Sequence, residues 1–546
     1  MAKAKTTDTN PETIGETSSA DTREIIEGAQ RMSGFDFATW RSAEDPVMRA
    51  TMIGLMLLEK EPDWEALLTR YDRASRINPV LRKKVVEGPL PLVTPRLIID
   101  PNFDLSFHLR RFDMPDGTTW NDVLMEARRQ SMTGFDLDRP LWQISIFNNL
   151  PGGRSVMLMK LHHAIADGQG AMLLGASLFD FSPEGQDLGP MPPEPKGEVM
   201  DTVGVTEASL KHQAQWYAKS AQEFVTGFPP ATAKALRHPR KMIKKVLVGV
   251  GSVAKIANMP LGPLSPLMTE RSINYHFGTF DVSFADMKSV SKASNHTVND
   301  LFLTAVAEGM ARYHMAEGRP VDRLRINMPV SLRTSADSIA NAVTIVRFEM
   351  PVAEVGAGKL MDEISAIVTK WREEPALRWT DTLAEFSRVL PVELLAAAAQ
   401  ASDVTASNVP GVPIPVWLAG AQVLRMYPLV STIGAAVNIT MLTYNGIASV
   451  GVSADDAAVV DRDLLMRSLR DGFADAVEAP VSSLSPLGDQ MDPDAPEPVV
   501  VKPKARKTVS RKATAPRKSA ARKSAARKPA PRNSAARKPA GEASDK

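Results

Sequence analysis

Hydrophobic and polar residues follow two different periods along this chain of 546 residues. Apolar positions at helical spacing over residues 64–70 predict an amphipathic helix, and a second helical pattern begins near Val298. Runs rich in apolar and β-branched residues predict strands over residues 145–149, 155–162 and 325–329. Because helices and strands are interspersed without a regular βαβα order, the pattern predicts an α/β protein with mixed sheets.

Residues 426–454 carry no charged side chain, a property that they share with membrane-spanning helices. The stretch contains Pro428 and the pair Asn445-Gly446, which is typical of a type I′ turn between two strands. We therefore expect two buried strands joined by a hairpin and no transmembrane helix.

The first 22 residues contain no apolar segment, so we expect no signal peptide and a cytoplasmic protein.

The distribution of Pro, Gly and charged residues predicts five segments. Residues 189–198 have the composition of a linker, and helical patterns follow over 206–224 and 231–257. We expect a disordered N-terminal extension over 1–31, an N-terminal domain over 32–185, a linker with crossover helices over 186–270, a C-terminal domain over 271–478 and a disordered basic tail over 479–546.

The composition excludes several kinds of chemistry and reveals an uneven charge. The chain has no Cys, which excludes a disulfide scaffold, Cys-ligated zinc, an iron–sulfur cluster and a thiolate nucleophile. The net charge of +2 combines opposite contributions. Residues 501–546 contain 16 Lys and Arg against 2 Asp and Glu, a net +14, and the other 500 residues therefore carry a net −12. The basic tail therefore has to be interpreted separately from the acidic body.

The basic tail repeats the sequence Ser-Ala-Ala-Arg-Lys, starting at Ser519, Ser524 and Ser534, and contains no aromatic residue. Without aromatic residues it cannot stack on bases, so nucleic acid would be bound through phosphates without sequence preference. Anionic lipid headgroups are a second possible partner, the acidic body of the chain is a third, and a purely solubilising role is the fourth. We favour the membrane surface and keep non-specific DNA as the alternative.

One short motif carries chemistry. His162 and His163 end a predicted strand, and Asp167-Gly168 follows at a short spacing. Adjacent side chains on a strand point to opposite faces, so we expect one histidine to act on a substrate and the other to be structural. An imidazole with an ordinary pKa near 6.5 suits proton abstraction from a hydroxyl. A buried, hydrogen-bonded histidine pair and a metal site are the alternatives, although no third ligand cluster is visible and we expect no metal.

Other catalytic motifs of group-transfer enzymes are missing. The sequence contains no Gly-x-Ser-x-Gly motif, and residues 356–359 do not form a phosphate-binding loop. A group transfer in this protein would therefore proceed by direct attack of the acceptor rather than through a covalent enzyme intermediate.

Residues 162–168 match the HHxxxDG motif of CoA-dependent acyltransferases and peptide-synthetase condensation domains. The chain resembles more narrowly the bacterial wax ester synthase/acyl-CoA:diacylglycerol acyltransferases. The resemblance extends in the family's order over about residues 32–475. Five further segments resemble family motifs: Asp104-Leu105 with His108-Leu109-Arg110, Pro140-Leu141-Trp142, Val298-Asn299-Asp300, residues 327–333 and residues 407–411.

The resemblance implies two chloramphenicol-acetyltransferase-like domains with a tunnel between them. It implies that His163 is the general base, that His162 supports it, that Asp167 is structural and that Gly168 keeps the tunnel open. Residues expected near the substrate are Asn299, Asp300, Pro140, Leu141 and Trp142. The implied substrates are acyl-CoA and either diacylglycerol or a long-chain alcohol, with no cofactor. Such acceptors imply contact with a membrane or a lipid droplet.

Simpler interpretations stand beside these roles. Trp142 suits core packing, Asn299-Asp300 suits a helix cap, residues 408–411 suit a turn and His108 suits a structural position. At the level of function, the alternatives are a condensation enzyme that uses carrier-bound substrates and a non-catalytic lipid- or DNA-associated protein with the same fold. His162 and Asp167 also fit the HxxxxD pattern of glycerol-phosphate acyltransferases, which lack the motifs of the second domain.

Overall fold

The computed structural model describes residues 30–88, 94–166, 170–171, 175, 177–196, 262–331, 343–352, 357–372 and 392–478. The expected crossover helices, residues 1–29 of the N-terminal extension, the C-terminal tail, Asp167 and Gly168 lie outside these residues, whereas Gln30 and Arg31, expected to be disordered, form a short strand. The chain divides into the compact unit Met1–Pro498 and the unit Val499–Lys546, and the described residues all belong to the first unit. The domain boundaries given above stay predictions.

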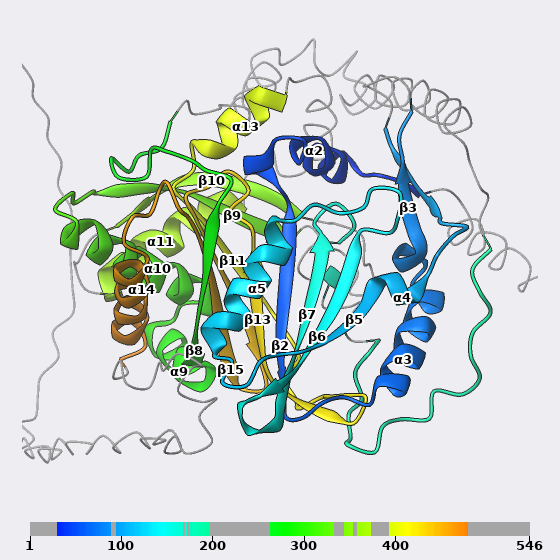
Figure 1. Ribbon diagram of the computed structural model, residues 1–546. Helices are drawn as coiled ribbons and strands as arrows, with labels where there is room; N and C mark the ends of the chain where they lie inside the picture. The colour runs from blue at the N-terminus through cyan, green and yellow to red at the C-terminus, as the bar shows by residue number, and fades with distance from the viewer. Residues whose placement is uncertain are drawn as a thin grey trace, which may run out of the picture. The chain divides into compact units, whose positions relative to one another are not determined.

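Two six-stranded sheets form the frame of the first unit (Figure 1). The first sheet has the order β12-β13-β2-β7-β6-β5. Its strands are β2 (Thr51–Leu58), β5 (Leu109–Asp113), β6 (Trp142–Leu150), β7 (Arg154–His162), β12 (Trp417–Leu418) and β13 (Ala421–Val430). The second sheet has the order β10-β9-β11-β14-β15-β8. Its strands are β8 (Tyr275–Ser283), β9 (Arg323–Ser331), β10 (Val343–Pro351), β11 (Val404–Val409), β14 (Val437–Tyr444) and β15 (Ile447–Asp455).

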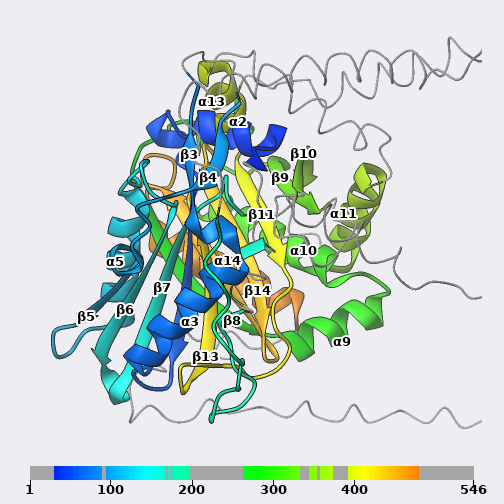
Figure 2. The same ribbon diagram turned by 90° about the vertical axis from the view of Figure 1, so that its right-hand side faces the viewer.

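Four of the described helices cover the faces that the two large sheets turn away from each other. In Figure 1, α5 lies across the first sheet, and α10, α11 and α14 lie against the second; Figure 2 shows α10 and α11 on the far side of the second sheet. The described helices are α2 (Gly34–Ser42), α3 (Trp64–Ile77), α4 (Leu105–His108), α5 (Trp120–Met132), α9 (Phe284–Ser294), α10 (Val298–Ala316), α11 (Ala357–Arg372), α13 (Val392–Gln400) and α14 (Arg462–Ala476).

The remaining described elements are short. A small sheet has the order β1-β4-β3, formed by β1 (Gln30–Arg31), β3 (Lys83–Val86) and β4 (Arg96–Ile99). Three 3₁₀ turns are η2 (Pro46–Met48), η3 (Pro79–Arg82) and η4 (Pro151–Gly153). None of the helices that the structure describes is both long and apolar enough to span a bilayer.

The predicted local elements are present. The helical pattern at residues 64–70 begins α3, the pattern near Val298 begins α10, and the predicted strands lie within β6, β7 and β9. The uncharged stretch forms β14 and β15, which pair antiparallel. Asn445 (φ 44°) and Gly446 (φ 83°) both adopt the left-handed conformation that a type I′ turn requires. The fold is therefore the expected α/β arrangement with mixed sheets.

Two strands from the second half of the chain, β12 and β13, lie in the first sheet, which the local patterns do not predict. β13 pairs antiparallel with β2 from Val423–Leu58 to Val430–Met52. The first sheet thus contains residues from both ends of the described chain. One of its faces, bearing Met52 and Met56, turns toward β11 and β14, and the face with Ile53 and Leu55 packs on α5.

Two glycines allow α10 and α14 to pack with their backbones in contact. A Cβ atom on Gly472 of α14 would lie 2.4 Å from the backbone nitrogen of Gly309 and 2.7 Å from the carbonyl oxygen of Ala305, both in α10. No side chain lies between the helices at this point, so the backbone itself would have to move to accept a methyl group.

We expect Gly472→Ala to lower the free energy of unfolding by about 1–3 kcal/mol, because overpacking against backbone cannot be relieved by a rotamer change. Thermal unfolding measures this as a lower melting temperature. The matched control is Gly358→Ala in α11, where a Cβ would meet no atom within 4 Å. That change should leave the melting temperature the same or slightly raise it. Equal melting temperatures for both variants would contradict the proposed backbone contact.

Candidate active site

The two histidines lie at the end of β7, an interior strand between β2 and β6. The backbone N–H of His163 donates to the carbonyl of Ala50 at 2.8 Å, which extends the β2–β7 pairing by one residue beyond the strand. His163 shares its face with Leu161 and Met159, and all three line a cavity. His162 points to the other face. The alternation of side chains along the strand therefore separates the histidines as the sequence predicts.

His162 is a buried and neutral side chain. Its ring packs against Trp40, with centroids 5.5 Å apart, and against Phe135, with centroids 5.6 Å apart. Its Nδ1 accepts a hydrogen bond from the backbone N–H of Ala164 at 3.1 Å, which places the ring proton on Nε2. Burial, together with the charges of His163 and Lys160, lowers the pKa of His162 to about 3. These contacts fix the turn that carries His163.

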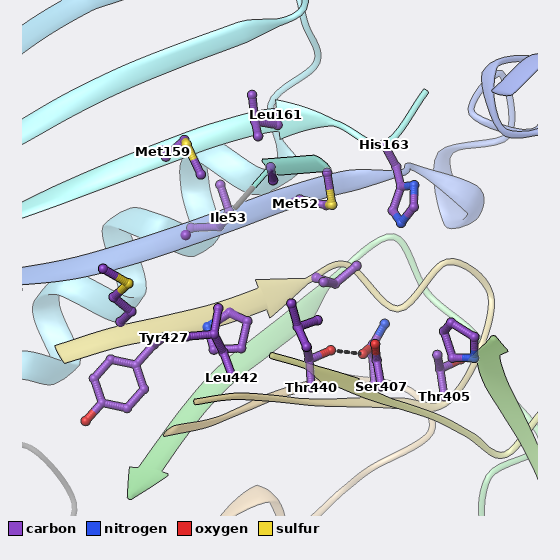
Figure 3. Close-up of a pocket in the computed structure, with 18 of the residues that line it drawn as sticks. Met52, Ile53, Met159, Leu161, His163, Thr405, Ser407, Tyr427, Thr440 and Leu442 are labelled. Atoms are coloured by element: carbon purple, nitrogen blue, oxygen red, sulfur yellow. Dashed lines mark hydrogen bonds between the residues drawn. The ribbon is translucent and has the colours of Figure 1, made fainter. Parts of the chain in front are cut away.

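The cavity lies between the two sheets and has a volume of about 180 Å³. Figure 3 shows His163 at one end of it and Tyr427 toward the other. Its first wall comes from β2, β7 and β13 and is apolar. The residues of this wall include Met52, Gly54, Met56, Met159, Leu161, Met426, Pro428 and Val430. A histidine at the end of an apolar cavity can exchange a proton with a substrate whose hydrocarbon part is held out of water.

The opposite wall of the cavity carries polar side chains from β11 and β14. They are Thr405, Ser407, Asn408, Asn438 and Thr440. The Thr440 hydroxyl donates to Asn438 Oδ1 at 3.0 Å, and Asn438 Nδ2 donates to the carbonyl of Ser431 at 3.2 Å. The sequence motif at residues 407–411 thus begins in a strand of the cavity wall. The sequence resemblance included Ser407 and Asn408, but nothing in their local pattern placed them opposite His163.

Pro140, Leu141 and Trp142 are not among the residues that line the cavity. Leu141 and Trp142 are buried in the core of the first sheet. Trp142 Nε1 donates to the carbonyl of Leu81 at 2.7 Å, and the carbonyl of Leu141 accepts from the backbone N–H of His162 at 3.1 Å. This packing gives Leu141 and Trp142 a structural function behind the histidines, and the role of all three residues as substrate contacts stays a prediction.

His108 is fully buried next to Trp142. Its Nδ1 donates to the carbonyl of Trp142 at 2.7 Å, and the two rings stack with centroids 4.3 Å apart. Burial is the main cause that lowers the pKa of His108 to about 4. A neutral ring held in this way serves packing, which agrees with the structural alternative for this residue.

Asp300 forms the capping box of α10 with Thr297. The Asp300 carboxylate accepts from the backbone N–H of Thr297 at 3.0 Å, and the backbone N–H of Asp300 donates to the Thr297 hydroxyl at 3.1 Å. Asn299 Nδ2 lies 3.9 Å from the sulfur of Met328, the residue before Pro329 in the cavity wall. Neither Asn299 nor Asp300 lines the cavity, so helix capping accounts for Asp300 and the substrate role of both stays a prediction.

Within the described ranges, no group of three or more His, Cys, Asp or Glu side chains is arranged to hold a metal ion.

The residues of the site that sequence reasoning missed are mostly the apolar ones on β2, β7 and β13. Their strand periodicity identifies them as buried, but a buried methionine in a cavity wall has the same local pattern as one in a core.

Models of two protein domains match this chain. The wax ester synthase/diacylglycerol acyltransferase catalytic domain matches residues 32–302, and the WS/DGAT C-terminal domain matches residues 339–476. A protein of Mycobacterium tuberculosis H37Rv, provisionally named a diacylglycerol O-acyltransferase, is 31% identical over 80% of this chain and 90% of its own length. The O-acyltransferase WSD of Acinetobacter baylyi is 24% identical over 65% of this chain and 77% of its own length.

Solved structures share the fold at low identity. The wax ester synthase/diacylglycerol acyltransferase of Marinobacter aquaeolei VT8 superposes with a TM-score of 0.54 at 18% identity, covering 82% of this chain and 98% of that one. The first condensation domain of the CDA synthetase gives a TM-score of 0.55 at 15% identity, covering 84% and 99%. With both domain models matched in order and a relative above 30% identity, the chain belongs to the wax ester synthase/diacylglycerol acyltransferase family of O-acyltransferases.

Proposed function

We propose that this enzyme transfers a long-chain fatty acyl group from acyl-CoA to the hydroxyl of diacylglycerol, forming triacylglycerol, or of a fatty alcohol, forming a wax ester. The observation that carries the proposal is the position of His163 at the end of an apolar cavity between the two sheets. The names of the relatives in Mycobacterium and Acinetobacter support it. Acyl-CoA is a substrate here, and the reaction needs no cofactor.

In the proposed reaction, an imidazole nitrogen of His163 takes the proton of the acceptor hydroxyl. The oxygen attacks the thioester carbonyl carbon, the C–O bond forms and the C–S bond breaks. The CoA sulfur leaves with the proton that the imidazolium returns. The chain has no Cys, so this direct attack requires no thiol nucleophile from the protein.

The two walls of the cavity suit different parts of the reactants. Methionine and leucine side chains on β2, β7 and β13 can bury an alkyl chain, and each buried methylene contributes about 0.8 kcal/mol. Across the cavity, the hydroxyls of Thr405 and Ser407 can donate to negative charge on the thioester oxygen. We assign Asp167 and Gly168 the structural roles that the HHxxxDG motif implies.

His162 is the positioning residue in this scheme. Its Nδ1 accepts from the backbone N–H of Ala164, and its ring is enclosed by Trp40 and Phe135, so it orients the turn without reaching the cavity.

We further propose that the enzyme works at the surface of a membrane or lipid droplet, since its acceptors are nearly insoluble, and that the basic tail contributes to binding there.

We expect His163→Ala to lower turnover by roughly 10²- to 10⁴-fold, because the attacking hydroxyl then loses its base. His162→Ala should lower turnover less but reduce the melting temperature more, because it removes a buried ring and its hydrogen bond. Steady-state kinetics with palmitoyl-CoA and each acceptor, together with thermal unfolding, measure both effects. His296→Ala is the control and should change neither, because His296 lies in the loop between α9 and α10 and pairs with Asp362 of α11. Near wild-type turnover of His163→Ala would refute the assignment.

Direct attack predicts that acyl-CoA and acceptor bind before any product leaves. Initial rates measured at several fixed acceptor concentrations should therefore give intersecting double-reciprocal lines. Mass spectrometry after incubation with acyl-CoA alone should detect the unmodified chain mass. Parallel lines, or protein carrying an acyl group, would show a covalent intermediate and overturn the proposed order.

Deleting residues 501–546 should leave turnover on detergent-dispersed substrates unchanged and weaken binding to vesicles containing anionic lipid. The physical reason is the net +14 of this segment, whose attraction to headgroups is screened by salt. Vesicle sedimentation at increasing salt concentration measures the effect, and neutral vesicles are the control. A gel-shift assay with duplex DNA tests the other polyanion. Tight DNA binding at physiological salt without vesicle binding would contradict the membrane role.

A further inference from the structure

The apolar wall of the cavity is built in rows, because three strands pair in register. Starting at His163, the first row contains Leu161, Met52 and Val430, which are paired neighbours on β7, β2 and β13. The second row contains Met159, Gly54 and Pro428 in the same order. All six residues line the cavity.

A third row lies deeper in the same wall. Met56 pairs with Met157 on one side and with Met426 on the other, and Met56 and Met426 line the cavity. Successive rows are two residues apart, or about 6.7 Å along the strands. The second row is therefore about 13 Å from His163 and the third about 20 Å.

An extended hydrocarbon chain advances about 1.3 Å per bond, given bonds of about 1.5 Å at tetrahedral angles. A chain that starts at a carbonyl beside His163 reaches the second row at about its tenth carbon and the third row at about its fifteenth. The wall thus has different residues for medium and for long chains. Tyr427 lies near the deep end (Figure 3).

Gly54 is the one residue in the first two rows without a side chain. It lies in the middle of β2, where glycine costs conformational entropy and leaves a gap in the packing. The gap is covered by Met159: a Cβ on Gly54 would lie 3.3 Å from its terminal methyl carbon and 3.9 Å from its Cβ. A larger side chain at position 54 would displace the flexible Met159 side chain, and the open space beside it is the cavity.

We propose that Gly54, together with Met159, determines how long an acyl chain the enzyme accepts. The absence of a side chain at position 54 keeps the second row open, so that chains longer than about ten carbons pass to the methionines of the third row. This inference rests on the proposed function, since it assigns the cavity to the acyl group.

The two walls of the cavity favour an acyl chain as its occupant, because one wall is apolar and the other is polar. The polar wall lies along the same space, so a single chain contacts apolar residues on one side and the carbonyl end remains near hydroxyl donors.

The test compares acyl-CoA substrates of 8 to 18 carbons, each with one fixed alcohol, for the wild-type enzyme and Gly54→Val. We expect the ratio of kcat/KM for the 16-carbon to the 8-carbon substrate to fall at least tenfold in the variant. Gly54→Ala should give a smaller fall of the same sign. In the double variant Gly54→Val/Met159→Ala, removal of the displaced side chain should restore much of the ratio.

Three outcomes would overturn the inference. A uniform loss for all chain lengths, with an unchanged melting temperature, would mean that Gly54 does not discriminate between chains. A shift in preference among alcohols of 8 to 16 carbons, at a fixed acyl-CoA, would assign the cavity to the acceptor. If Gly54→Val does not fold, an unchanged ratio in Gly54→Ala would decide against the inference. Failure of the proposed function is distinguishable, since the wild-type enzyme would then transfer no acyl group of any length.

Discussion

The pairing of β13 with β2 is the constraint on which the rest of the structure depends. β13 belongs to the first sheet by its hydrogen bonds and packs on the second by its side chains and backbone. A Cβ on Gly451 of β15 would lie 1.8 Å from the carbonyl oxygen of Pro428, so the two sheets meet there with no side chain between them. Arg425 adds an ion pair with Asp281 of β8, with Nε 2.9 Å from Oδ2. The walls of the cavity are thereby held in a fixed relation.

The chemistry of the site follows from this frame through strand alternation. β7 lies between β2 and β6, so both of its edges are paired, and its two terminal histidines point to opposite faces with different surroundings. One face is closed by aromatic rings and keeps His162 neutral, and the other opens on the cavity and receives His163. Leu141 helps to hold His162 in this position, since its carbonyl accepts a hydrogen bond from the backbone N–H of His162. Trp142, the next residue, is buried in the core of the same sheet.

The sequence predicted what depends on neighbouring residues. The Asn445-Gly446 hairpin, the start of α10 and the strands before and after residue 151 all follow from local periodicity and turn chemistry. The pairing of β13 with β2 was not predictable in this way, because strand pairing between distant segments leaves no local pattern. The structure puts the motif residue Trp142 in a core and Asp300 in a helix cap, as the simpler interpretations of the sequence predict.

The crossing of β13 also has a consequence for synthesis of the protein. Thr51 and Ser431, which are joined by a hydrogen bond at the end of the β2–β13 pair, are 380 residues apart. At about 5–20 residues per second, a ribosome needs roughly 20–75 s to make the second after the first. Throughout that interval the nascent chain presents the edge of β2 unpaired, and exposed edges of this kind recruit other chains. The first sheet can therefore be completed only after β13 has been made, and a fragment that ends before β13 would lack the strand that pairs with β2.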